Sequence, residues 1–311
     1  MSVTVVGSIA FDAVKTPFGE HDRILGGAAV HFGIAASFFD DVRIVGPVGD
    51  DFGEPELQVL WNRRIDTADV EHVAGGKTFF WRGEYGWDLN RRETLETQLN
   101  VFEHFQPKLS EASRSCDVLF LANIQPQLQR QVREQCTQAR FTALDSMNIW
   151  IEGEREALVE TIGRVDCVML NDAELRQLTE RSSLLGAARE VLGWGPRVVV
   201  AKMGEYGAAM ITAEGYFSLP AFPLESVIDP TGAGDTFAGG FVGYIAAHPE
   251  RDLDDELLRR AMAYGTAMAS FNVEEFGTER VARLTPPEIS ERVGMLERIT
   301  HFRDAPIAMR A

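Results

Sequence analysis

The residues best suited to chemistry lie in a glycine-rich stretch, DPTGAGDTF, at residues 229–237. Glycine lets the backbone turn sharply and approach a ligand closely, while Asp and Thr favour the start of a helix. The apolar run TFAGGFVGYIAA follows at 236–247 and predicts a buried helix. The carboxylate of Asp235 and several unpaired backbone N–H groups would therefore meet at the positive end of that helix.

This arrangement suits phosphoryl transfer. Asp235 can accept a proton from an attacking hydroxyl while backbone N–H groups stabilise charge on the transferred phosphoryl group. The N–H groups in question belong to Thr231, Gly232, Ala233 and Gly234. An ordinary glycine-rich turn closed by an Asp cap explains the same pattern, and local physics alone leaves both interpretations open.

Two other phosphate-binding motifs are excluded. The segment GGKT at 75–78 ends like a P-loop, but that motif requires a glycine where Glu71 stands. The first predicted strand leads into GSIAFD at 7–12, which lacks the G-x-G-x-x-G of a dinucleotide site.

Short apolar strands alternate with helical segments along the chain. The predicted strands are residues 3–7, 42–46, 117–122, 141–145, 166–170 and 197–201. Continuous apolar runs are typical of strands covered on both faces, and the alternation predicts right-handed βαβ units. We therefore expect a three-layer α/β/α sandwich with a mostly parallel central sheet.

One region breaks this alternation. Residues 72–100 alternate like a hairpin, are rich in aromatic residues and contain a turn-like RGEYG at 82–86. We expect a small β lid formed by about 12–25 and 66–100, inserted in a single domain that spans 1–311.

Composition limits the partners. A formal charge of −17 argues against non-specific binding to nucleic acid, which relies on basic patches. No apolar run reaches membrane-spanning length, and the N-terminus reads as a strand rather than a signal peptide. Three widely spaced cysteines form neither a disulfide framework nor a metal motif, which favours reduced thiols in a cytoplasmic protein.

Taken together, four motifs resemble those of the ribokinase family, also called the PfkB carbohydrate kinases. DPTGAGDTF resembles the C-terminal signature D-T-x-G-A-G-D-x-F, with Asp-Pro in place of Asp-Thr. The other three matches are GGAAVHFGIA at 26–35 with VGPVGDDFG at 45–53, NDAE at 171–174, and AKMGEYGAAM at 201–210. The resemblance implies a ribokinase-like fold with a β lid, ATP as donor, Mg²⁺, and transfer to a hydroxyl of a sugar or nucleoside.

The resemblance also implies roles for single residues. Asp235 would be the catalytic base, and an anion hole would be formed by Gly232, Ala233 and Gly234. Asn171 and Glu174 would hold the Mg²⁺ shell through water, although the same pair fits a helix-capping box.

The substrate residues include one departure from the family pattern. Asp12 matches the aspartate that binds substrate hydroxyls, and Gly26 and Gly27 would let the substrate approach the backbone. His31 stands where many relatives have asparagine, and two interpretations are open: it contacts the substrate, or it is a structural histidine in the core. Asn123, after the third predicted strand, is a further candidate.

A second group is expected on the nucleotide side. Its members are Thr231, Lys202, Gly204, Gly207, Asn272 and Gly277. In the family, the loop that contains Gly277 lines the adenine pocket and, with Asp229, sometimes encloses a monovalent cation such as K⁺.

The residues of the predicted lid do not decide which acceptor is phosphorylated. Trp81, Tyr85 or Trp87 could stack on a nucleobase or sugar, but packing of the lid or a homodimer through the lid is favoured. We expect a kinase that phosphorylates the hydroxymethyl group of a sugar. The alternatives are a nucleoside kinase, a phosphosugar kinase that uses the lid arginines Arg82, Arg91 and Arg92, and a non-catalytic sugar or nucleotide sensor.

Overall fold

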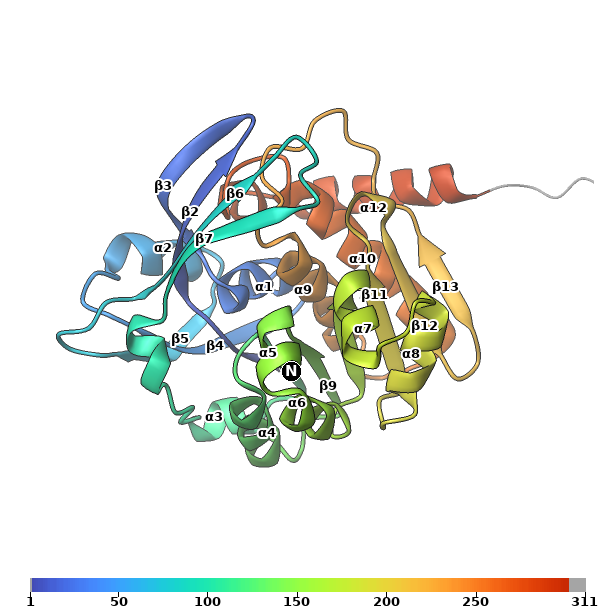
Figure 1. Ribbon diagram of the computed structural model, residues 1–311, viewed down its shortest axis with the longest axis horizontal. Helices are drawn as coiled ribbons and strands as arrows, with labels where there is room; N and C mark the ends of the chain where they lie inside the picture. Colours follow the sequence, from blue (N-terminus) through green and yellow to red (C-terminus); the bar gives the residue numbers. More distant parts are fainter. Residues whose placement is uncertain (1, 302–311) are drawn as a thin grey trace, which may run out of the picture.

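A nine-stranded sheet forms the centre of the computed structural model, which describes residues 2–301 (Figure 1). Its order is β13-β12-β11-β10-β9-β8-β1-β4-β5, with seven neighbouring strands parallel and β12 and β13 antiparallel. The bounds are β1 Ser2–Val6, β4 Asp41–Val48, β5 Asp66–His72, β8 Val118–Leu121, β9 Phe141–Asp145, β10 Cys167–Asn171, β11 Val198–Lys202, β12 Ala208–Thr212 and β13 Tyr216–Leu219. The predicted α/β sandwich is confirmed.

Helices cover both faces of this sheet. One apolar core lies against α1 Ala28–Ala36, α2 Glu54–Asn62, α9 Ala233–Ala246, α10 Asp255–Asn272, α11 Glu279–Ala282 and α12 Pro286–Thr300. The other lies against α3 Glu111–Arg114, α4 Pro126–Gln135, α5 Asn148–Gly153, α6 Arg155–Ile162, α7 Asp172–Thr179 and α8 Leu184–Leu192. Two short 3₁₀ helices, η1 Asn100–His104 and η2 Gly204–Tyr206, complete the elements. None of the described helices is long and apolar enough to cross a membrane.

The central strands are buried because both of their faces carry apolar side chains. All four residues of β8 (VLFL) and the first four residues of β10 (CVML) are buried. Each side chain packs into one of the two cores, which explains why these strands read as continuous apolar runs rather than as alternating patterns.

Close packing explains the glycines of α9. A Cβ on Gly239 would lie 2.4 Å from the backbone oxygen of Phe32 in α1. A Cβ on Gly240 would lie 2.9 Å from the backbone oxygen of Tyr264 in α10. The glycines therefore let α9 sit tightly between two helices, and its first turn is rigidly placed.

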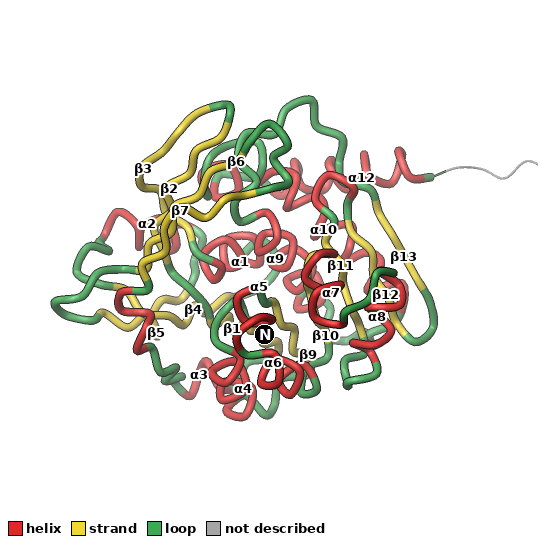
Figure 2. The backbone as a smooth tube through the Cα atoms, viewed as in Figure 1, coloured by secondary structure: helices red, strands yellow, loops and turns green. Residues whose placement is uncertain are grey.

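A second, four-stranded sheet is separate from the large sheet (Figure 2), and Phe11 on one of its strands packs into the first apolar core. Its order is β3-β2-β6-β7, with bounds β2 Ala10–Thr16, β3 Gly19–Gly26, β6 Phe79–Tyr85 and β7 Arg92–Gln98. Two expectations about this lid were wrong in detail. The first four residues of RGEYG (82–85) belong to strand β6, and the turn follows at 86–91. Residues 66–72 do not belong to the lid, because they form β5, an edge strand of the large sheet.

Candidate active site

The first turn of α9 lies at the carboxyl edge of the parallel strands, where open α/β sheets bind ligands. Gly232 caps the helix in the left-handed region, with φ 74°, which a residue with a Cβ rarely adopts. The N–H of Ala233 donates to the Pro230 oxygen at 3.2 Å. Within the described residues, no protein acceptor is found for the N–H groups of Gly232 and Gly234. Two donors are therefore available to an anion.

Asp229 fixes the loop that precedes this helix. Its fully buried carboxylate accepts hydrogen bonds from the Thr231 N–H at 2.8 Å and the Gly277 N–H at 3.1 Å. Two predicted nucleotide-site residues, Thr231 and Gly277, are thereby joined through one side chain. Burial is the main reason that the pKa of Asp229 is raised.

Two carboxyl groups, those of Asp12 and Asp235, lie near the start of α9. Burial, assisted by the charge of Asp145, raises the pKa of Asp235 to about 7. Burial, assisted by the charges of Asp229 and Asp235, raises the pKa of Asp12 on β2 to about 7. Asp12 packs so closely on Gly26 that a Cβ there would lie 2.0 Å from its Oδ2. Near neutral pH, Asp235 is therefore poised to take up a proton.

A buried ion pair stands next to these acids. Lys202, the last residue of β11, donates from Nζ to Oδ2 of Asp145, the last residue of β9, at 2.5 Å. A Cβ on Gly234 would lie 3.0 Å from the same Nζ, so the ammonium reaches the start of α9. Burial lowers the pKa of Lys202, but Asp145, Glu174 and Asp235 outweigh it and the net shift is upward. Lys202 therefore stays charged beside the anion-binding N–H groups.

Asn171 and Glu174 form the capping box of α7. The Asn171 Oδ1 accepts from the Glu174 N–H at 2.7 Å, and Glu174 Oε2 accepts from the Asn171 N–H at 2.8 Å. Burial raises the pKa of Glu174 to about 7, against the opposing charge of Lys202. No group of three or more His, Cys, Asp or Glu residues in the described chain can by itself enclose a metal ion. Water-mediated binding by Glu174 is the mode that these residues fit, since Mg²⁺ retains several waters.

Two predicted substrate residues have side chains engaged by protein groups. His31 is 3% exposed, and its Nδ1 lies 3.1 Å from Oδ1 of Asn272, which is fully buried. Asn123 accepts a hydrogen bond from the Trp150 indole at 2.9 Å and donates to the Met147 sulfur at 2.9 Å. Gly27, with φ 97°, lies against the backbone of Ser8 and Ala10 at the base of the lid.

The nucleotide-side glycines form a tight turn between β11 and β12. Gly204 and Gly207 both have positive φ, and η2 lies between them. The lid reaches this turn, because Asn90 donates to Oε1 of Glu205 at 2.9 Å. Residues expected at the nucleotide site thus also contact the tip of the β6–β7 hairpin.

The inner face of the lid carries an aromatic platform. Trp81 is the register partner of Asp12, so both side chains lie on the face toward α9. A Cβ on Gly83 would lie 2.1 Å from a Trp81 ring carbon, so the outer part of the indole lies over this glycine. The Trp81 indole N–H donates to Thr94 at 3.3 Å. Tyr85, on the same face, accepts a hydrogen bond from Thr231 at 3.2 Å and so links the lid to the loop before α9.

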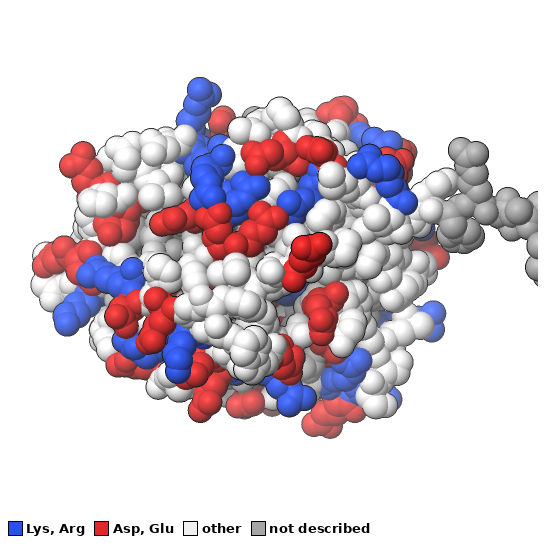
Figure 3. Space-filling view, turned by 90° about the horizontal axis from the view of Figure 1, so that it is seen from above, with Lys and Arg blue, Asp and Glu red and all other residues white. Residues whose placement is uncertain are grey.

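The lid arginines differ in their surroundings. Arg82 lies near Asp22 and Glu96, and Arg91 near Asp88. No ion pair within 4 Å is found for Arg92 among the described residues, and its charge lowers the pKa values of Asp12, Glu174 and Asp235. Figure 3, seen from above, shows basic and acidic side chains interspersed on this side.

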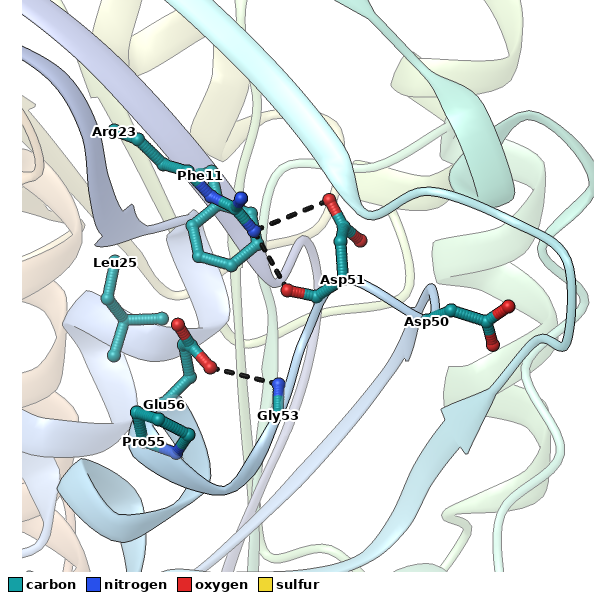
Figure 4. Close-up of a pocket in the computed structure, with 8 residues that line it drawn as sticks. All are labelled: Phe11, Arg23, Leu25, Asp50, Asp51, Gly53, Pro55 and Glu56. Atoms are coloured by element: carbon teal, nitrogen blue, oxygen red, sulfur yellow. Dashed lines mark hydrogen bonds and ion pairs between the residues drawn. The ribbon is translucent and has the colours of Figure 1, made fainter.

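A hollow of about 470 Å³ lies elsewhere, between the base of the lid and α2 (Figure 4). Arg23 stacks over Phe11 at 3.8 Å and donates to the Asp51 backbone oxygen at 2.8 Å, while Glu56 accepts from the Gly53 N–H. None of the predicted site residues lines this hollow, because Phe11 points to the opposite face of β2 from Asp12.

Comparison with known proteins decides the family. The model of the pfkB family carbohydrate kinases matches residues 3–283. The chain belongs to this family. As a PfkB-family member it is a phosphotransferase.

Individual relatives cover most of the chain. It is 29% identical over 259 residues to a cytidine kinase from Thermococcus kodakarensis, covering 80% of this chain and 90% of that protein. It is 26% identical over 292 residues to an aminoimidazole riboside kinase from Salmonella typhimurium, covering 88% and 90%. A solved structure of Burkholderia thailandensis nucleoside kinase in complex with inosine shares the fold, with a TM-score of 0.77 at 21% identity over 97% of this chain and 99% of that one.

Sequence reasoning missed Asp145 in this PfkB site. Its signal was present, because a carboxylate ends the buried strand FTALD as Asn171 and Lys202 end theirs. The β9-β10-β11 order brings these three strand ends together at one edge of the sheet.

Proposed function

We propose that this protein transfers the γ-phosphoryl group of ATP to the hydroxymethyl group of a ribofuranosyl nucleoside. One observation carries the proposal: the Asp235 carboxyl, two unpaired N–H groups and the Lys202 ammonium converge on the first turn of α9. Asp235 accepts the hydroxyl proton, while Gly232, Gly234 and Lys202 stabilise charge on the phosphoryl group.

Trp81 supports a nucleoside over a simple sugar. Its indole lies on the same lid face as Asp12, so an acceptor held at Asp12 can extend a planar base toward it. The relatives named as a cytidine kinase and an aminoimidazole riboside kinase act on compounds of this class. A free sugar that carries a hydroxymethyl group is the second candidate, since Asp12 and Gly26 need only hydroxyls and the family is one of carbohydrate kinases.

The other acceptor alternatives have less support. A phosphosugar needs unpaired basic residues, yet Arg82 and Arg91 already lie beside acids and only Arg92 has none. A non-catalytic sensor would have no use for a base with a raised pKa.

Two cofactors accompany the proposal. Mg²⁺ would be held through water by Glu174 and Asn171, and when bound it neutralises charge on the nucleotide phosphates. A monovalent cation such as K⁺ would lie near Asp229, whose buried carboxylate already joins the loops at Thr231 and Gly277. We further propose that the chain acts as one domain, binds small molecules rather than nucleic acid, and works in the cytoplasm, where its three buried cysteines stay as free thiols.

A homodimer through the lid is a further proposal. Trp87 is 84% exposed and contacts Phe18 edge-on at the tips of two lid hairpins, which leaves apolar surface for a second lid. Sedimentation would show this directly.

The first test is Mg²⁺-dependent ADP release across nucleosides, free sugars and sugar phosphates. We expect turnover with nucleosides that rises with pH through about 7, as Asp235 loses its proton. Asp235→Asn should lower kcat by roughly 10²–10⁴-fold. The exposed Asp252→Asn serves as the matched control. Turnover that is equal in Asp235→Asn, or absent for every acceptor, would contradict the proposal.

A further inference from the structure

A buried hydrogen-bond network lies directly behind the start of α9. Asn272 Nδ2 donates to the backbone oxygen of Thr231 at 2.7 Å. Its Oδ1 is 2.9 Å from Thr236 Oγ1 and 3.1 Å from His31 Nδ1. The last residue of α10 thus connects α1, α9 and the loop that precedes α9.

This network fixes the tautomer of His31. A backbone oxygen can only accept, so the Thr231 contact identifies the Asn272 nitrogen and leaves Oδ1 facing the histidine. His31 must therefore carry its proton on Nδ1 and donate. Burial lowers the pKa of His31 to about 4, so the ring is neutral near pH 7. Nε2 is then a bare acceptor, and no hydrogen-bond partner for it is found among residues 2–301.

The ring itself supports the glycine that caps α9. A Cβ on Gly232 would lie 2.4 Å from Cγ, Nδ1 and Cε1 of His31, so the face of the imidazole lies against the Gly232 Cα. Gly232 holds a left-handed conformation, with φ 74°, and its N–H is one of the two unpaired donors. The imidazole thus fills the space into which this loop could otherwise move away from a bound anion.

We propose that His31 is a positioning residue for phosphoryl transfer. Together with Asn272, it holds the Thr231–Gly232 backbone so that the unpaired N–H groups at the start of α9 stay directed toward the transferring phosphoryl group. Two independent contacts support this role, the ring against Gly232 and the Nδ1–H donated to Asn272. Removing either contact loosens the donors that bind the transferring group, while the ground-state binding of ATP and acceptor through other residues is retained. The inference rests on the proposed function.

Three variants separate the two contacts. His31→Ala removes both contacts, whereas His31→Phe keeps a ring against Gly232 but loses the N–H donor. Thr236→Val removes the hydroxyl that also donates to Asn272. His248→Phe is the matched control, because His248 is half-buried just beyond α9 and its ring Nδ1 lies 2.8 Å from the Tyr244 backbone oxygen, away from the loop before α9. Thermal unfolding and circular dichroism establish that each variant is folded.

We expect His31→Ala to lower kcat roughly 30- to 100-fold, in the range known for a misplaced catalytic group, with both KM values changed less than about threefold. His31→Phe and Thr236→Val should lie between His31→Ala and the unaltered protein. Binding of ADP with aluminium fluoride, which mimics the transferring phosphoryl group, should weaken in parallel with kcat, while binding of ADP alone should not change. A role in stability alone would not separate these two ligands.

Two outcomes would overturn the inference. An unchanged kcat in folded His31→Ala would mean that the ring does not position the anion hole. A raised KM for the acceptor at constant kcat would make His31 a direct substrate contact. Failure of the proposed function is distinguishable, because the unaltered protein would then lack acceptor-dependent turnover.

Discussion

The two sheets of this molecule differ in burial and in the candidate site residues that they carry. The central strands of the large sheet are buried on both faces, and three of them end in Asp145, Asn171 and Lys202. In the small sheet, every residue of β7 is exposed, and the groups that face the site are Asp12, Trp81 and Tyr85. In the proposed function, the chemistry is therefore built on the buried strands of the large sheet, and acceptor recognition on a small sheet whose outer strands β3 and β7 are mostly exposed.

This difference separates the expected effects of mutation. Changes at the large sheet should lower kcat, because its groups act on the transferring phosphoryl group. Changes at the lid should mainly raise the KM of the acceptor, because its groups contact the acceptor or hold the lid closed.

After Asp235, the largest effect is expected at Lys202. Lys202→Met removes the ammonium that lies beside Gly234 and leaves Asp145 as an unpaired buried carboxylate. We expect kcat to fall by about 10²–10³-fold, equivalent to ~3–4 kcal/mol, as for loss of one group that stabilises transition-state charge. The exposed Lys108→Met should be silent in the same steady-state assay. An equal kcat in both variants would place the chemistry elsewhere.

Much of this rigid part could be predicted from sequence. The glycine-rich DPTGAGDTF, the strand ends at Asn171 and Lys202, and the parallel sheet follow from residue types and order along the chain. Asp145 could not be paired with Lys202, because that contact depends on β9 and β11 flanking β10. Likewise, the sequence left His31 open between a substrate contact and a core residue, and only the packing of α1 on Gly232 shows what it touches.

The lid was harder to predict for a physical reason. Turn-like residues in RGEYG suggested a loop, yet Gly83 lies within β6 and makes room for the Trp81 ring. Gly83 is therefore a glycine that leaves space for a neighbouring side chain, and turn propensity along the sequence does not predict such a contact. The predicted lid also included residues 66–72, which instead form β5, an edge strand of the large sheet that pairs in parallel with β4.

The next prediction tests the cost of holding an acid in the site. Asp12 is 6% exposed, with its pKa raised to about 7, chiefly by burial. Between pH 4 and 7 the unfolded chain releases this proton while the folded protein keeps it, so the group destabilises the fold increasingly as pH rises. Asp12→Asn should therefore raise the free energy of unfolding by up to about 4 kcal/mol at pH 8 and have little effect at pH 4.

Denaturant unfolding at the two pH values measures this difference. Asp88→Asn, at an exposed acid on the lid turn, is the control. A stabilisation of Asp12→Asn that is equal at both pH values would show that Asp12 is not held protonated by burial.

Trp81→Ala tests the recognition side of the comparison. Loss of the platform across Gly83 should cost about 1–2 kcal/mol of base stacking, and so raise the KM for a nucleoside about tenfold with kcat little changed. Trp81→Phe should recover part of the loss, and the exposed Trp87→Ala should have no such effect unless the lid tips form an interface. If the KM for ribose rises as much as the KM for a nucleoside, Trp81 supports the lid rather than a base.

The smallest effect is expected at the contact that joins the two sheets. Tyr85→Phe removes the acceptor for the Thr231 hydroxyl while keeping the buried ring, and a neutral hydrogen bond contributes about 0.5–1.5 kcal/mol. Because this bond links the lid to the loop before α9, its loss should favour the open lid and raise the acceptor KM about two- to fivefold. Steady-state kinetics with the exposed Tyr216→Phe as control can resolve a change of this size. A fall in kcat without a change in KM would instead mean that Tyr85 helps to hold the loop before α9 in place for the chemistry, and the division of labour between the two sheets would be less complete.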